Sequence, residues 1–247
     1  MEIEILYLIT FILVTLQTIV GVGVLVLGTP IFLLFNYNIL EIMNLLLPIS
    51  ITTSLLNYIY LKTNKAKLKI NLDKEIKKYF IIIFLPGIFL GLFLTKELIN
   101  YINFKALVSI VIFISLLIKW KFNYKINSLP LKFKNLILML ISVVHGLTNS
   151  GGTLLTIFFT SFDNNKKNQS RYSITFYYLI LATVQYLVFL IIFKNQTTFF
   201  YNYKILLIII LSTFFGSIIT KYTSQNFFKR IIEILALFSA LFLLLNN

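Results

Sequence analysis

The chain has no cysteine, a single histidine and only eight acidic residues among its 247 residues. Without cysteine there can be no disulfide, thiolate metal site or cysteine nucleophile. No acidic residue lies in the middle of an apolar segment, which argues against a carboxylate proton relay or a cation cage inside a membrane. The sequence also lacks a phosphate-binding GxxxxGK[ST] motif, a Ser/His/Asp set and a cluster of metal ligands. We therefore expect no enzymatic activity, no metal and no cofactor.

Charged residues of either sign are scarce. They make up 12% of the chain, whereas hydrophobic residues make up 59% and the mean hydropathy is +0.92. A soluble domain carries about 25% charged residues. Because the apolar residues come in long runs, the composition predicts a polytopic membrane protein. The first residues, Met-Glu-Ile-Glu, lack the positive region of a cleavable signal peptide, so the first apolar segment is expected to be retained.

The net charge of +14 could indicate a nucleic-acid partner. The lysines and arginines lie, however, in short connections between apolar runs, and this pattern is typical of charges that set membrane topology. We therefore expect the lipid bilayer of the cell membrane as the partner, and no nucleic acid.

Two uncharged stretches are too long for one membrane helix each. No charged residue lies between Glu4 and Glu41 or between Lys134 and Asp163, whereas a membrane helix needs about 20 residues. Small and polar residues interrupt both stretches, over residues 21–30 and 145–153. Paired interruptions of this kind point to the binding site of a transporter, because broken helices line such sites.

Charge-free runs divide the chain into eight segments and predict an all-α polytopic membrane protein. The segments cover about residues 5–35, 39–60, 79–95, 106–118, 133–162, 172–193, 205–220 and 231–245. A shift of 125 positions places Gly21 on Gly146 and Gly91 on Gly216. We therefore expect two four-segment repeats with broken first helices, namely residues 1–120 and 135–247, joined by a basic cytoplasmic linker at 121–134. Four crossings per half would make the repeats parallel, whereas a re-entrant hairpin counted as a crossing would make them inverted.

The basic residues predict an orientation. The loops after the second, fourth and sixth segments hold 14 lysines and arginines, against 8 in the loops on the opposite side. This excess predicts that both termini lie in the cytoplasm. A re-entrant segment would change the count.

The interrupted segments carry motifs of a known family. The first half has Gly21-Val22-Gly23 followed by Pro30, the second has Asn149-Ser150-Gly151-Gly152-Thr153, and Gly87 and Gly91 follow Pro86. With these motifs in this order, the chain resembles the TauE/SafE sulfite-exporter family of membrane permeases. It departs from the family pattern in the first half, where two of three consecutive glycines are missing, and at Phe158, where a proline would fall. The resemblance implies secondary transport of a small anion, such as sulfite, an organosulfonate or a small organic acid.

The candidate binding residues lie at the two breaks and on the segments that follow them. Helix N-terminal ends at a break attract anions, and glycine lets a ligand approach the backbone. Packing of small residues between helices is the alternative reading, which we favour for Gly87 and Gly91 but not for residues 146–153. The candidates are Gln17, Gly21, Gly23, Thr29, Ser50, Thr53, Asn57, His145, Thr148, Asn149, Ser150, Gly151, Gly152, Thr153 and Tyr178.

Two residues that can carry a positive charge, His145 and Arg171, each have two competing interpretations. His145 could take up a proton in a proton-coupled cycle, or it could be a neutral packing residue. Arg171 could attract or gate an anion, although a topology charge at the membrane interface is the interpretation we favour.

Two functions other than transport stay open. A membrane assembly or interaction protein is compatible with the incomplete glycine motif of the first half. An intramembrane enzyme is less compatible, because His145 alone could supply catalytic chemistry within a segment.

Overall fold

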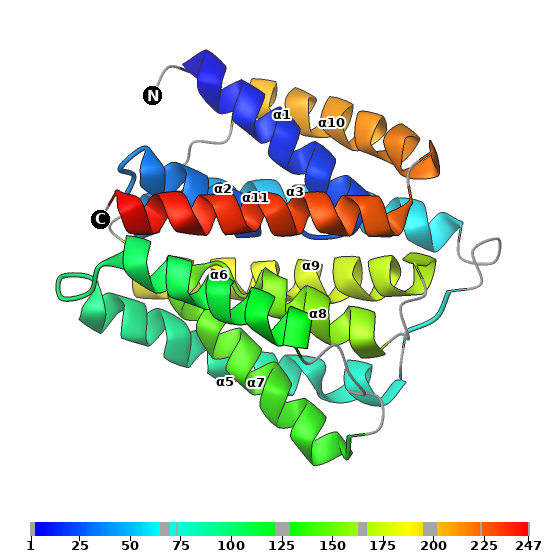
Figure 1. Ribbon diagram of the computed structural model, residues 1–247. Helices are drawn as coiled ribbons and strands as arrows, with labels where there is room; N and C mark the ends of the chain where they lie inside the picture. Colours follow the sequence, from blue (N-terminus) through cyan, green and yellow to red (C-terminus); the bar gives the residue numbers. More distant parts are fainter. Residues whose placement is uncertain are drawn as a thin grey trace.

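The computed structural model describes residues 3–64, 70–72, 74–121, 129–162, 167–194, 202–222 and 224–246 (Figure 1). Throughout this part of the chain the regular elements are ten α-helices, which confirms the predicted all-α class. They are α1 (Ile3–Val20), α2 (Val24–Leu34), α3 (Ile39–Thr63), α5 (Lys74–Leu98), α6 (Phe104–Lys121), α7 (Leu131–Thr148), α8 (Gly152–Phe162), α9 (Lys167–Ile192), α10 (Tyr203–Tyr222) and α11 (Gln225–Leu245).

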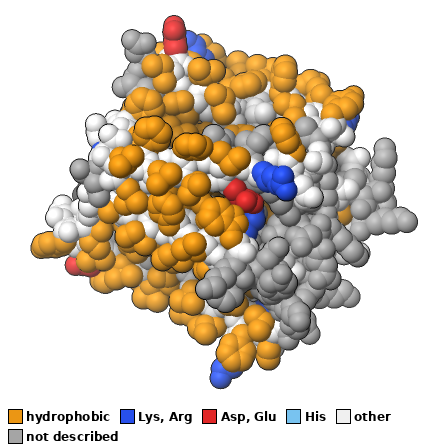
Figure 2. Space-filling view, in the orientation of Figure 1, with side chains coloured by type: hydrophobic (Ala, Val, Ile, Leu, Met, Phe, Trp, Pro, Cys, Tyr) orange, Lys and Arg blue, Asp and Glu red, His pale blue; other side chains and the backbone are white. Residues whose placement is uncertain are grey.

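The helices and the outer surface of the bundle are apolar, as in a membrane protein. Six helices, α1, α3, α5, α7, α9 and α10, are long and apolar enough to cross a membrane, and α2 and α8 are shorter apolar helices. Large apolar side chains such as Ile114, Leu117 and Phe238 are exposed. Figure 2 shows that hydrophobic side chains cover much of the face on which α6 and α11 lie. Helices suit this environment because they satisfy every backbone polar group internally. The chain is therefore a multi-pass membrane protein, while the count of eight crossings stays a prediction.

Both predicted breaks are present, and both are shorter than predicted. Break 1 covers Gly21–Gly23 and separates α1 from α2, and break 2 covers Asn149–Gly151 and separates α7 from α8. Gly21 has a φ of 96°, a conformation that favours glycine, and Asn149 adopts a left-handed conformation with φ 59°. Residues 28–30, including Pro30, lie inside α2, and residues 145–148 lie inside α7.

Each break reverses the chain direction. The backbone N–H of Val24 donates to Oε1 of Gln17 at 3.0 Å, and Gly28 packs against Leu13, so α2 runs back along α1. Gly151 packs directly on His145, so α8 likewise runs back along α7. The pairs α1–α2 and α7–α8 are helical hairpins, called hairpin 1 and hairpin 2 below.

The two hairpins open at opposite ends of the bundle. Figure 1 places both chain termini at one end, the terminal end, where Lys105 at the start of α6 donates to Asn36 after α2 at 2.9 Å. Hairpin 1 opens there. Gly91 and Gly146 are in contact, and Thr95 donates to the carbonyl of Leu147, so α7 runs parallel to α5. Both helices begin at the end opposite the termini and run toward the terminal end. Hairpin 2 therefore opens at the end opposite the termini.

The two hairpins change which end of the bundle each connection between helices belongs to, and therefore the count of basic residues at each end. The predicted charge count assumed that residues 5–35 and 133–162 each cross the bundle once, whereas each returns to the end at which it began. The connections and helix ends opposite the termini then carry seven, five, three and three lysines and arginines, 18 in all, and the terminal end carries four. This sequence count differs from the predicted 14-to-8 distribution, and the end opposite the termini is called the basic end below.

Four pairs of helices join the N-terminal half of the chain to the C-terminal half. Helix α1 packs along α10, where Thr18 contacts Gly216, and α7 packs along α5, where Gly146 contacts Gly91. Helix α3 packs against α9, and α6 against α11. Gly146 therefore serves close packing between helices, which corrects the cavity-lining role expected for it.

Candidate anion site at the two helix breaks

The two hairpins meet at the centre of the bundle. The side-chain amide of Asn149 in break 2 donates from Nδ2 to the Oγ1 atom of Thr29 in α2 at 3.0 Å. Gly152, the first residue of α8, packs against Val22 of break 1 and Tyr178 of α9. The structure thus brings together predicted site residues from both halves of the chain.

Gln17 joins break 1 to α3. Its Nε2 atom donates to Oγ of Ser54 at 2.9 Å and to the carbonyl oxygen of Ser50 at 3.1 Å, while its Oε1 atom accepts from the N–H of Val24. The first N–H groups of a helix lack partners within the helix, so Gln17 caps α2. This predicted ligand is already engaged in holding hairpin 1 together.

Other predicted residues on α3 are also engaged. Asn57 donates to the hydroxyl of Thr18 at 3.2 Å, and Thr53 donates to the carbonyl of Ile49 one turn earlier in its own helix. A hydroxyl bonded to its own helix carries little information about a ligand. The structure therefore does not bring Thr53 into the group at the breaks.

Break 2 is a compact polar turn. The backbone N–H of Ser150 donates to Oγ1 of Thr148 at 3.2 Å, and Thr153 donates to Oγ of Ser115 on α6 at 3.1 Å. The side chains of Thr148, Asn149 and Ser150 are completely buried. The first contact lies within the turn, and the second holds the start of α8 against α6.

Four buried residues beside break 2 form what we call the central cluster: His145, Asn149, Tyr178 and Gln185. Both ring nitrogens of His145, Oδ1 of Asn149 and Oε1 of Gln185 have no hydrogen-bond partner, the hydroxyl of Tyr178 lies beside Ser50 and the backbone of Leu25, and all four side chains are 0% exposed. The ring centroids of His145 and Tyr178 lie 6.0 Å apart, and Nε2 of Gln185 donates to the carbonyl of His145. A polar group buried without a partner costs about 1–3 kcal/mol, so a bound ligand or water would stabilise this cluster.

Gln185 was not among the predicted site residues. It is one of few polar residues in the second half of α9, between Ala182 and Phe189. A polar residue inside a membrane helix is a functional candidate by default, so its isolation in an apolar run was the available signal.

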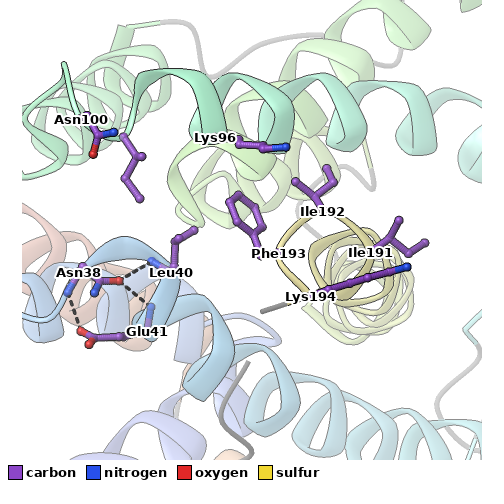
Figure 3. Close-up of a pocket in the computed structure, with 10 residues that line it drawn as sticks. Asn38, Leu40, Glu41, Lys96, Asn100, Ile191, Ile192, Phe193 and Lys194 are labelled. Atoms are coloured by element: carbon purple, nitrogen blue, oxygen red, sulfur yellow. Dashed lines mark hydrogen bonds between the residues drawn. The ribbon is translucent and has the colours of Figure 1, made fainter. Parts of the chain in front are cut away.

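Three cavities surround this centre, and the central cluster lines none of them. The largest of the three, about 960 Å³, opens at the terminal end between α3, α5 and α9, and Figure 3 shows Lys96, Phe193 and Lys194 around it. A second of about 310 Å³ opens at the basic end beside Arg171. A third, about 40 Å³, reaches Thr153 and Ser115 behind the ion pair of Lys119 and Glu233. With its side chains fully buried, the central cluster is closed to both ends.

A model of the family "Sulfite exporter TauE/SafE" matches residues 6–243 of the chain. The chain belongs to the TauE/SafE sulfite exporter family. The match confirms the resemblance predicted from the break motifs and covers both hairpins of this TauE/SafE protein. No curated protein and no solved structure matches the chain significantly.

The TauE/SafE family is a transporter family, so the chain belongs to a family of membrane transporters. Within the described residues no group of three or more His, Cys, Asp or Glu is placed to hold a metal ion. What the central arrangement offers chemically is a set of buried hydrogen-bonding groups at a helix N-terminus, which suits binding better than bond cleavage.

Proposed function

We propose that this TauE/SafE protein is a secondary transporter of a small oxyanion, such as sulfite, an organosulfonate or a small organic acid. The observation that carries the proposal is the central cluster, because it places unpaired polar groups where two broken helices meet in mid-bundle. In transporters this is the position at which substrates bind, and family membership supports the same class of function.

The anion is expected nearer break 2 than break 1. Gln17 already caps the N-terminus of α2, whereas α8 begins at Gly152 beside the unpaired groups of the central cluster. A helix N-terminus attracts negative charge through its dipole and its N–H groups. The cluster offers both donors, on His145 and Tyr178, and acceptors, on Asn149 and Gln185, and this mixture suits an oxyanion that carries a proton or arrives with a water.

We further propose that the two halves are inverted repeats. Hairpin 1 opens at the terminal end and hairpin 2 at the basic end, and the pairing of α1 with α10 corresponds to that of α7 with α5. Alternating access would then be a rocking of one half against the other around the central cluster. The closed centre fits an occluded step of that cycle.

The charge distribution supports an orientation opposite to the one expected from the sequence. With 18 of the 22 lysines and arginines at the basic end, the basic end would face the cytoplasm and both termini the other side.

Flux measurements in reconstituted vesicles test the proposal. We expect saturable, protein-dependent movement of ³⁵S-labelled sulfite, kept free of oxygen, and a loss of at least tenfold in Asn149→Ala. Absence of flux for sulfite, organosulfonates and carboxylates from a folded protein would reject transport and favour a membrane interaction protein.

Proton coupling is a separate part of the proposal and rests on His145, the single histidine of the chain. We expect His145→Gln to change the pH dependence of flux. Unchanged flux and unchanged pH dependence in this variant would leave His145 a packing residue.

A further inference from the structure

The cavity at the basic end, of about 310 Å³, contains a cation that the central site does not use. It lies between the end of α3, the start of α9 and the end of α10, and Arg171, Lys221 and Asn168 are among its lining residues. Arg171 is only 6% exposed, so its side chain lies inside the bundle rather than on the surface of this end.

The guanidinium of Arg171 is only partly satisfied. One terminal nitrogen donates to the carbonyl oxygen of Thr18 at 2.6 Å, and Nε has no hydrogen-bond partner. In the part of the chain that the structure describes, the one ion pair is that of Lys119 with Glu233, so no described carboxylate neutralises Arg171. Burying a charge without a counter-charge costs several kcal/mol, and a bound anion would remove that penalty.

The contact with Thr18 gives Arg171 a structural part as well. Thr18 lies in the last turn of α1, where carbonyl groups lack helical partners and a cation is stabilising. This contact uses one of the five N–H donors of the guanidinium. A neutral donor could replace it, but only a cation could also attract an anion.

Further unpaired polar groups connect Arg171 to the centre. Thr175, Tyr178 and Gln185 follow Arg171 on α9 at spacings of 4, 7 and 14 residues, which places all four near one face of the helix. Oγ1 of Thr175 and Oε1 of Gln185 are buried and unpaired, and the hydroxyl of Tyr178 between them in sequence is buried as well. This face also borders break 1, because a Cβ on Gly21 would lie 3.3 Å from Oγ1 of Thr175.

We propose that the basic-end cavity binds a small oxyanion, with Arg171 as its principal ligand and Lys221 at its margin, and that the α9 face leads from there to the central cluster. Arg171 suits this role because its planar guanidinium binds oxyanions through two parallel hydrogen bonds. The binding of the anion stands on Arg171 alone, whereas its place on a transport path rests on the proposed function.

A free oxyanion and the phosphate of a lipid headgroup share the chemistry that Arg171 recognises. The burial of Arg171 within the bundle favours the free ion, since a headgroup would have to leave the lipid surface to reach a side chain that is 6% exposed. Both sources can be tested on the same purified protein.

The test is a titration of thermal stability with the full chain in neutral detergent. Sodium sulfite, without oxygen, is compared with sodium chloride at equal ionic strength for wild type, Arg171→Gln, Arg171→Lys and Lys221→Gln. The matched control is Arg230→Gln, which removes an exposed arginine at the same end. We expect the apparent Kd for sulfite to weaken at least tenfold in Arg171→Gln and less in Arg171→Lys and Lys221→Gln, and to stay unchanged in Arg230→Gln.

Without added anion, Arg171→Gln should unfold at the same temperature as wild type or higher, because it removes an uncompensated buried charge. Equal sulfite responses in wild type and Arg171→Gln would overturn the proposal. If Arg171→Gln does not fold, Arg171→Lys and Lys221→Gln decide in its place, since an unchanged Kd in both would overturn the proposal equally. Stabilisation by phosphatidylglycerol but not by sulfite, dependent on Arg171, would identify a headgroup site and reject the free oxyanion.

The two proposals fail in distinguishable ways. Asn149→Ala should lower flux at least tenfold and keep the sulfite response that depends on Arg171. That response without flux in any variant would reject transport and retain the site. Flux without an Arg171-dependent response would reject the site and retain transport.

Discussion

The amide of Asn149 donates to the hydroxyl of Thr29 across 3.0 Å, although 120 residues separate them in the chain. Asn149 ends α7 in a left-handed conformation, and Thr29 lies in the middle of α2. The bond therefore joins the break of hairpin 2 to the short helix of hairpin 1. It couples the two halves at the point where one half would rock against the other.

Thr29→Val should weaken this coupling. The substitution keeps the shape of the side chain and removes the acceptor, which leaves the buried amide of Asn149 unpaired at a cost of about 1 kcal/mol or more. We expect a lower Tm and reduced sulfite flux. Thr183→Val is the matched control, because the Thr183 hydroxyl bonds only to the carbonyl of Leu179 in its own helix. Equal effects of the two substitutions on Tm and flux would contradict a specific role for the bond.

Gly152→Ala should separate the hairpins by a steric route. A Cβ at residue 152 would lie 2.8 Å from both the Tyr178 ring and Cγ2 of Val22, closer than real Cβ contacts. Overpacking of this kind costs about 1–3 kcal/mol. We expect a lower Tm, and partial recovery in the double variant Gly152→Ala/Val22→Ala, because the second change removes one of the clashing atoms. Strictly additive effects in this double-mutant cycle would show that the two residues do not compete for space.

The positions of the helices could be predicted from the sequence because charge-free runs and glycine clusters are local signals. The two breaks fall inside the predicted intervals for this reason. The direction of the chain after each break could not be predicted. A stretch such as that from Glu4 to Glu41 fits one long tilted helix or a hairpin equally well, since the return of α2 depends on Gln17 reaching Val24.

The candidate site was predicted unevenly for the same reason. Asn149 and Thr29 were identified as polar residues at breaks, but nothing local indicates that they pair across the two halves. Arg171 follows a connection that contains other basic residues, so its sequence neighbours suggest an interfacial charge. Its burial depends on the packing of α9 against α3 and on the contact of Arg171 with Thr18 of α1.

The ion pair between Lys119 at the end of α6 and Glu233 on α11 should control access to the small cavity beside Thr153. Both side chains are about one-fifth exposed and line the cavity, and Nε1 of Trp120 donates to Glu233 at 3.4 Å. Glu233→Gln removes the charge pair, so we expect Trp120, the single tryptophan, to become more accessible to iodide quenching. The effect on stability should be small, about 1 kcal/mol or less, because the pair is partly solvated.

The exchange Lys119→Glu/Glu233→Lys provides the control for this prediction, because it restores an ion pair of reversed polarity. Quenching of Trp120 in the exchanged protein should return toward the wild-type value. If quenching rises equally in the single variant and in the exchange, the ion pair does not hold these helix ends together.

Membrane orientation can be determined with single cysteines, since the natural chain has none to react. Tyr101, between α5 and α6 at the terminal end, and Tyr222, at the end of α10 at the basic end, are both 84% exposed and form a matched pair. With 18 basic residues at the basic end, we expect a membrane-impermeant maleimide to label Tyr101→Cys in intact cells and Tyr222→Cys only after permeabilisation. The reverse pattern would place both termini in the cytoplasm. Labelling of both residues from the same side would contradict hairpin 2. Between Tyr101 and Tyr222 the helices α6, α9 and α10 each run from one end of the bundle to the other, whereas α7 and α8 together return to the end at which they began.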